Sequence, residues 1–104
     1  MPESPARLTV TRDHDLLVVV GDIDAHSCPD LAASLDPLPG AGDVRIDLAA
    51  VDFMDSSGLR VIIGAHQRAN DADRRLVLER PSAPVLRIIE ISGLAEHLHI
   101  DVAG

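Results

Sequence analysis

The peptide Asp55-Ser56-Ser57-Gly58 places two hydroxyl groups directly after a carboxylate. Apolar residues follow it at helical spacing, so we expect a helix that begins at Ser56 and runs to about Ala69. Asp55 can cap that helix through its side chain, which leaves the hydroxyls of Ser56 and Ser57 in the first turn beside unpaired backbone N–H groups. The helix dipole and these N–H groups would stabilise a phosphate on Ser56. The peptide therefore fits a phosphoserine site, although most such peptides at a helix start are caps only.

Gly58 lies inside the expected helix, where glycine costs about 1 kcal/mol relative to alanine. We expect its missing side chain to leave room for the backbone of another molecule. A second polar segment, residues 21–27 (GDIDAHS), follows a run of apolar residues and contains Asp24. Ligands gather at the carboxyl ends of the strands in an open α/β sheet, and both segments are expected at that edge.

Period-two or continuously apolar segments alternate with segments of helical period along the chain. The former predict strands, at residues 7–12, 16–20 (buried on both faces), 44–48, 76–78 and within 94–102. The latter predict helices that begin near Ser27, at Ser56 and near Ser82, while residues 49–54 are expected to form a loop. Two strands come first, as a hairpin, and each later strand follows a helix. This order predicts an α/β fold with a mixed, mostly parallel sheet that begins with an antiparallel hairpin and is covered by α-helices.

Capping residues mark the ends of two of the expected helices. Ser27 and Asp30 have the spacing of a capping box at the start of the first helix, whose apolar periodicity reaches Leu38. Ser82 is expected to cap the third helix, and Gly93 is expected to end it in a left-handed conformation.

The length of 104 residues fits one domain, residues 1–104. Hydrophobic residues make up 46% and charged residues 25% of the chain, which is typical of a globular protein and excludes a largely disordered one. Acidic residues outnumber basic residues by 17 to 9, and the formal net charge of −8 repels nucleic acid phosphates and anionic lipids. We therefore expect neither direct nucleic acid binding nor insertion into a membrane.

Missing residue types exclude further chemistry. The chain has no lysine, so a Schiff base, a phosphate-loop lysine and a lysine general base are all excluded. The single cysteine, Cys28, cannot form an internal disulfide and is expected to be packed, although a helix start can make a thiol more reactive. No apolar run approaches the ~20 residues of a membrane helix, and the first residues lack the apolar core of a signal peptide. We therefore expect a cytoplasmic protein.

The stretch VDFMDSSGLRVIIGAHQ (residues 51–67) resembles the signature of the STAS domain, in particular that of the bacterial anti-sigma factor antagonists. The segment GDIDAHS is similar to the glycine-acid-apolar-Asp segment of this family. The stretch SAPVLRIIEISGLAEHLHI (residues 82–100) resembles its closing helix. The three matches occur in the family's order and together span essentially the whole chain.

This resemblance implies that Ser56 is phosphorylated by a partner anti-sigma factor that is also a serine kinase. Ser57 corresponds to a neighbouring serine or threonine and not to the acceptor. Asp24 and Asp55 are implied to lie in the surface that faces the kinase. Arg60 departs from the family pattern, because members often have glycine there, and it can either pair with phosphoserine or tune which partner fits.

As an anti-sigma factor antagonist, the unphosphorylated protein would bind the kinase and release a sigma factor, and phosphorylation of Ser56 would end this binding. A phosphatase would reset the switch. The protein would be a regulatory substrate, without cofactor or metal, and not an enzyme. An alternative within the same family is an accessory subunit of a membrane transporter that docks on an ATPase.

Two kinds of catalytic or signalling chemistry use the same residues less well. Phosphorylation of Asp52 or Asp55, as in receiver domains, requires by resemblance a lysine that this chain lacks. A small serine hydrolase with Ser56 or Ser57 as its nucleophile and His26 as its base lacks the G-x-S-x-G elbow. Both alternatives are therefore weaker than a phosphoserine switch.

The remaining histidines allow a metal-binding alternative. His97, His99 and Asp101 alternate in sequence and, on one face of a last strand, can bind a metal weakly. An exposed terminal strand explains them more simply. His66, on the apolar face of its helix, is expected to be a core or boundary residue.

Overall fold

A five-stranded sheet forms the centre of the computed structural model, which describes residues 8–102. The strands lie in the order of the sequence, as β1 (Leu8–Asp13), β2 (Leu16–Ile23), β3 (Val44–Met54), β4 (Leu76–Glu79) and β5 (His99–Asp101). β1 and β2 form an antiparallel hairpin, and the later neighbours pair in parallel. The predicted α/β fold with a mixed, mostly parallel sheet is therefore confirmed. The predicted start of the first strand at Arg7 lies outside the described residues.

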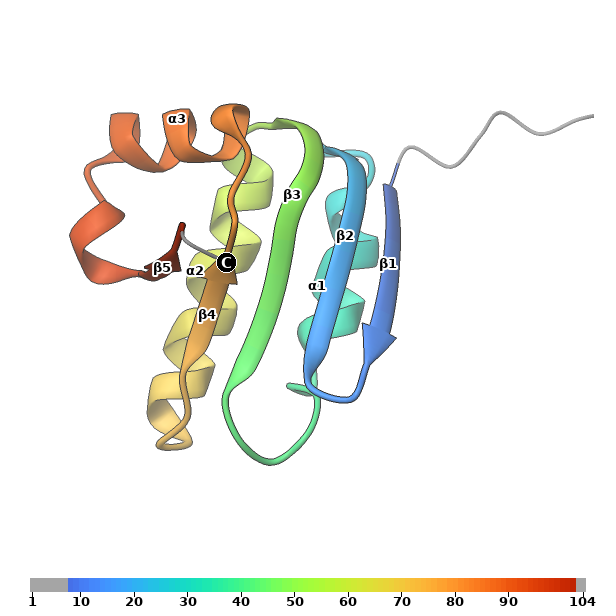
Figure 1. Ribbon diagram of the computed structural model, residues 1–104, viewed down its shortest axis with the longest axis vertical. Helices are drawn as coiled ribbons and strands as arrows, with labels where there is room; N and C mark the ends of the chain where they lie inside the picture. Colours follow the sequence, from blue (N-terminus) through green and yellow to red (C-terminus); the bar gives the residue numbers. More distant parts are fainter. Residues whose placement is uncertain (1–7, 103–104) are drawn as a thin grey trace, which may run out of the picture.

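In the described part of the chain, the helices are α1 (Cys28–Leu35), α2 (Ser56–Asp71), α3 (Ala83–Ser92) and a short 3-10 helix, η1 (Ala95–His97), which precedes β5. α1 and α2 pack side by side behind the sheet in Figure 1, and α3 lies across the end of the sheet beside β3. Of the helices within residues 8–102, none is both long and apolar enough to cross a membrane.

The core lies between the sheet and the pair α1 and α2. It is formed by buried aliphatic side chains that include Leu17, Val19, Ile46, Leu48, Leu76 and Leu78 of the strands and Leu31, Leu35, Ile62 and Ala65 of the helices. In the described part of the chain no helix covers the opposite face of β2 (Figure 1), and Val20 on that face is 45% exposed. The prediction that residues 16–20 are buried on both faces is therefore wrong, because α1 and α2 cover the same face.

β3 continues to Met54, whereas the sequence predicts that this strand ends at residue 48 and that a loop follows. Its pairing with β2 contains two irregularities, each of which accommodates an extra residue of β3. The two bulges turn pairs of neighbouring residues outward, so the buried residues Leu48, Val51 and Met54 recur at every third position. This spacing matches neither the period of a strand nor that of a helix, and it hides the end of β3 from a periodicity analysis.

Two serine hydroxyls at helix starts bond to neighbouring backbone instead of capping. Ser27 occupies the N-cap position of α1, but its hydroxyl accepts from the N–H of Asp24 (3.0 Å) and donates to the carbonyl of Asp22 (2.8 Å). Ser82 occupies the N-cap position of α3, and its hydroxyl donates to the carbonyl of Val51 at 2.6 Å. The predicted capping box at Ser27 and the predicted cap bond of Ser82 are therefore wrong, although both helices begin where expected.

Proline and glycine determine where α1 and α3 end. α1 ends at Leu35 and not at Leu38, because Pro37 disfavours helical backbone at Asp36, which is extended with φ −138° and ψ 101°. Leu38 still packs against the core from outside the helix, which explains its apolar character. Gly93 ends α3 in the left-handed conformation with φ 77°, as predicted.

Candidate functional site

The ends of β2 and β3 bring the two predicted polar segments together. The strands pair in parallel as far as Ile23 and Met54, and the N–H of Asp55 donates to the carbonyl of Ile23 at 3.1 Å. Asp24 and Asp55 therefore each follow the end of a strand at the same edge of the sheet, which is the upper edge in Figure 1. This is the carboxyl edge at which the sequence predicts a site.

Asp55 caps α2, as predicted. Its backbone is extended, and its Oδ1 accepts hydrogen bonds from the N–H groups of Ser57 (2.9 Å) and Gly58 (3.3 Å). Two of the four N–H groups that open a helix are satisfied in this way. The cap fixes the start of α2 and thereby the position of Ser56, its first residue.

Ser56 is exposed, whereas its neighbour Ser57 is half-buried. Within residues 8–102 the hydroxyl of Ser56 has no hydrogen-bond partner, while the hydroxyls of Ser27 and Ser82 are both bonded to backbone. Of the two adjacent hydroxyls, that of Ser56 is therefore the more accessible to another molecule.

Gly58 is buried, and packing within the protein explains why this residue is glycine. A Cβ at this position would lie 2.5 Å from Cγ2 of Ile23 and 2.8 Å from Cγ of Met54. Both distances are too short for a real Cβ, so α2 can pack this closely on the ends of β2 and β3 only because residue 58 has no side chain. The expectation that the space at Gly58 receives the backbone of another molecule is wrong, because side chains of the protein itself fill it.

Asp24 organises the loop between β2 and α1. Its Oδ1 accepts from the N–H groups of His26 (3.0 Å) and Ser27 (2.9 Å), a local pattern typical of an Asx turn. Asp24 therefore has a structural role, whatever it contributes to a partner surface. His26 is exposed, and no hydrogen bond to another described residue orients its ring, as a general base would require.

A hollow of about 340 Å³ lies between this loop and the first turns of α2. Ala25 and Cys28 line one side of it, and Ser57 and Arg60 line the other. Arg60 is exposed and forms no ion pair with any residue that the structure describes. Two predicted site residues, Ser57 and Arg60, thus share one surface with the loop that follows β2.

The histidines form a separate cluster. The ring of His66, which is half-buried as predicted, has its centroid 5.5 Å from that of His99, and its Nε2 lies 3.2 Å from the side-chain amide of Asn70. Burial lowers the pKa of His66, and the neighbouring His99 and His97 lower it further.

His97 belongs to η1, so the predicted alternation of His97, His99 and Asp101 along one strand is wrong. Across residues 8–102, no three His, Cys, Asp or Glu side chains are placed to hold a metal ion.

Two features of β3 are not apparent from sequence patterns. Phe53 is the chain's single Phe, Tyr or Trp residue, and it is 47% exposed. Its uniqueness can be read from the sequence, but its exposure results from the second bulge of β3. Ser82 donates its N–H to the carbonyl of Leu48 (3.3 Å) and its hydroxyl to that of Val51, which joins the start of α3 to β3.

Solved structures share this arrangement of strands and helices. The crystal structure of an anti-sigma factor antagonist from Mycobacterium paratuberculosis matches with a TM-score of 0.79 at 23% identity, over 96% of this chain and 90% of that chain. The structure of the anti-sigma factor antagonist SpoIIAA in its unphosphorylated form matches with a TM-score of 0.68 at 20% identity, over 89% of this chain and 86% of that chain. At these identities the likeness shows the fold alone.

Sequence comparison identifies the family. Residues 6–101 match the family model described as "Mlab, STAS domain". The anti-sigma-B factor antagonists of Staphylococcus epidermidis and Staphylococcus aureus are 33% and 32% identical to this chain over 96 residues, which cover 89% of this chain and 89% of each relative. The chain therefore belongs to the STAS domain family, as the resemblance of its motifs implies.

Proposed function

We propose that this protein is an anti-sigma factor antagonist that is controlled by phosphorylation of Ser56. The class of function is supported by relatives, 33% and 32% identical, that are named anti-sigma-B factor antagonists. The mechanism is supported by one observation above all: the exposed hydroxyl of Ser56 follows a carboxylate that is already engaged in capping α2. In its unphosphorylated state the protein binds an anti-sigma factor kinase, which then releases its sigma factor.

The kinase transfers the γ-phosphoryl group of ATP to Ser56. The bond between Oγ and phosphorus forms as the bond to the leaving ADP breaks, and the hydroxyl proton passes to a base of the kinase. The STAS protein is thus the substrate of this reaction and acts as a regulator without catalysing a step itself. The product has about 1.5 to 2 additional negative charges at the start of α2.

Phosphorylation acts on the docking surface and leaves the fold intact. The start of α2 tolerates a phosphate, because the helix dipole and the remaining free N–H groups offset its charge. A docked kinase, however, would have to accept a bulky dianion where it previously accepted a neutral hydroxyl, and both overlap and desolvation oppose this. Each ~1.4 kcal/mol lost at this contact weakens binding tenfold. Removal of the phosphate by a phosphatase restores binding.

The proposed partner surface also includes Asp24, Asp55, Ser57 and Arg60. It is supported by the common edge of the sheet and by the hollow that Ser57 and Arg60 share with the loop after β2. Arg60 follows Ser56 by four residues on α2, a spacing at which side chains of a helix can pair. Gly58 contributes indirectly, because its missing side chain lets α2 sit close to β2 and β3.

A kinase assay with matched serine variants tests this proposal. Wild type, Ser56→Ala and Ser57→Ala are each incubated with the anti-sigma factor kinases of the source genome and ATP, and the phosphate is located by peptide mass spectrometry. We expect one phosphate on wild type and on Ser57→Ala, and none on Ser56→Ala. A phosphate on Ser57, or a wild-type protein that none of these kinases binds or modifies, would refute the proposal.

A further inference from the structure

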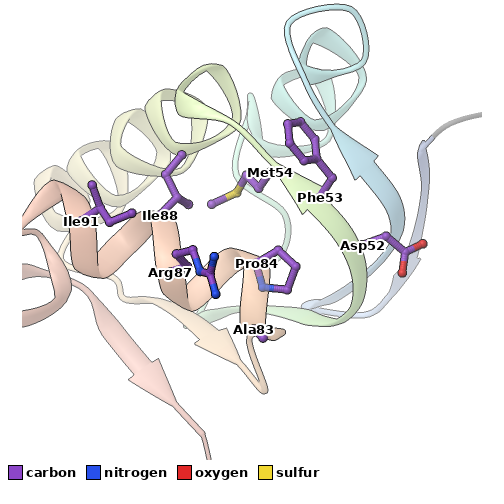
Figure 2. A pocket seen from close by; sticks show the side chains of 8 residues that line it. All are labelled: Asp52, Phe53, Met54, Ala83, Pro84, Arg87, Ile88 and Ile91. Carbon is purple, nitrogen blue, oxygen red and sulfur yellow. The ribbon is translucent and has the colours of Figure 1, made fainter.

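A groove of about 540 Å³ lies between the end of β3 and α3 (Figure 2). Apolar side chains form most of its lining, namely those of Phe53, Met54, Ala83, Pro84, Ile88 and Ile91. Arg87 projects into the groove from α3, and Asp52 lies at its far end with its carboxylate turned away (Figure 2). The groove is therefore an apolar surface with one cation inside it.

The walls of the groove expose large apolar side chains to solvent. Phe53 is 47% exposed and Ile91 is 78% exposed. None of the buried core residues in the described part of the chain is aromatic, and Phe53, the chain's single Phe, Tyr or Trp residue, lies on the surface. Exposed apolar patches mark binding sites, and aromatic residues are enriched in protein interfaces. These features favour a protein contact at the groove.

The groove lies within reach of any partner that covers Ser56. Phe53 precedes Ser56 by three residues, and an extended chain of that length spans at most about 11 Å. A specific interface buries about 800 Å² of each partner, which corresponds to a disc of about 16 Å radius. Phe53 therefore lies within the radius of an interface of this size centred on Ser56.

The charge in the groove indicates the chemistry of that contact. Arg87 is exposed and forms no ion pair with any residue between 8 and 102. The formal net charge of the whole chain is −8, so an isolated arginine beside an apolar groove is a local exception to the overall acidity. A carboxylate on the partner would pair with it, and partial burial at an interface would reduce the screening of this pair by salt.

We propose that the groove is a second contact of the anti-sigma factor kinase, which inserts an apolar side chain between Phe53 and Ile91 and places a carboxylate beside Arg87. This inference rests on the proposed function, because nearness to Ser56 identifies the occupant. A small molecule fits the groove less well, because sites for small molecules bury most of the ligand, whereas both walls here are open to solvent.

Binding measurements with surface variants test this contact. The probe is the anti-sigma factor kinase that phosphorylates wild type, and its Kd is measured by calorimetry for Phe53→Ala, Ile91→Ser and Arg87→Glu. Val102→Ser is the control for Ile91→Ser, because Val102 is 67% exposed and follows β5, outside the groove. Arg75→Glu is the control for Arg87→Glu, because Arg75 is exposed and lies just before β4, at the opposite edge of the sheet. Thermal melts verify that each variant is folded.

We expect each groove variant to weaken binding about tenfold or more and each control to stay within about twofold of wild type. If Ser56→Glu abolishes binding while the groove variants bind as wild type does, the proposed function stands and the groove contact is wrong. If none of the anti-sigma factor kinases of the source genome binds or phosphorylates wild type, both proposals fail. A wild-type dimer that Ile91→Ser dissociates, with unchanged Kd for the kinase, would overturn the groove contact in favour of a second copy of this chain.

Discussion

The starts of α2 and α3 lie at the same edge of the sheet but use serine in opposite ways. At α2, Asp55 caps the helix and the hydroxyl of Ser56 has no partner within the described residues. At α3, Ser82 occupies the N-cap position and its hydroxyl is bonded to the carbonyl of Val51. Both peptides look like helix caps in the sequence. The difference is that the hydroxyl of Ser82 is bonded to a carbonyl of a strand packed against it, whereas the hydroxyl of Ser56 has no such acceptor among the described residues and stays available for modification.

The close packing at the start of α2 predicts the largest effect. Gly58→Ala should lower the free energy of unfolding by about 1–3 kcal/mol, because the added Cβ would collide with Ile23 and Met54. Gly64→Ala in the same helix is the matched control, since its Cβ would meet only Arg68 Nη1 at 3.5 Å, and it should raise the free energy by about 0.5–1 kcal/mol. Urea denaturation followed by circular dichroism measures both. Equal effects of the two substitutions would contradict the close packing at Gly58.

The next largest effect is the difference in stability between variants that lack the hydroxyl of Ser82 and of Ser56. Ser82→Ala should cost about 1 kcal/mol, because it removes the hydrogen bond to the carbonyl of Val51. Ser56→Ala should change stability by less than about 0.5 kcal/mol, since no described group bonds to its hydroxyl. Thermal melts at one pH compare the variants with wild type. A Ser56→Ala variant as unstable as Ser82→Ala would give Ser56 a structural role and break the comparison.

A smaller effect on stability, one that depends on pH, is expected from the side chain of His66 in α2. The pKa of His66 is lowered from 6.5 by burial and by His99 and His97, so the unfolded chain takes up a proton more readily than the folded one. Stability should therefore be constant above pH 6.5 with respect to this group and should fall as the pH drops through the lowered pKa. His66→Gln should reduce that fall, whereas His26→Gln, at an exposed loop position, should not. Urea denaturation measures the free energy of unfolding between about pH 7.5 and about pH 5, a range chosen around the ordinary histidine pKa. A pH dependence that His66→Gln leaves unchanged would show that another group causes it.

The smallest effect concerns Arg60 and phosphoserine at position 56. An exposed ion pair is worth about 0.2–1 kcal/mol. Arg60→Ala should therefore lower the Tm of the phosphorylated protein slightly more than that of the unmodified protein. Melts of the four species measure this coupling. Equal shifts would show that Arg60 does not pair with the phosphate and would leave it the role of tuning partner fit.

The sequence predicts the order of the elements and the cap of α2 because both depend on local chemistry. An alternating pattern, a helical period and an aspartate before a helix act within a few residues of the chain. Gly93 is predicted for the same reason, since its left-handed conformation follows from its own lack of a side chain.

Contacts between distant segments are the part that the sequence does not predict. The hydroxyl of Ser82 finds the carbonyl of Val51 only after β3 and α3 have packed. The glycine at position 58 of α2 is explained by the side chains of Ile23 in β2 and Met54 in β3, and not by its own helix. The exposure of Phe53 likewise depends on how β3 pairs with β2. The residues of the candidate site can thus be named from the sequence, whereas the surface around them is apparent only in the tertiary structure.

The bulges of β3 have a consequence for insertions and deletions in this part of the chain. Removal of an extra residue within a bulge, such as Asp52, leaves the pairs Gly21–Val51 and Ile23–Met54 able to form in the same register. Removal of one residue from the regular part of β3, such as Ile46, would exchange inward and outward side chains along the rest of the strand. β3 therefore has two positions, the bulges, at which a residue can be lost while Ser56 keeps its position at the end of the strand. Elsewhere in β3, the loss of one residue would change which side chains face the core.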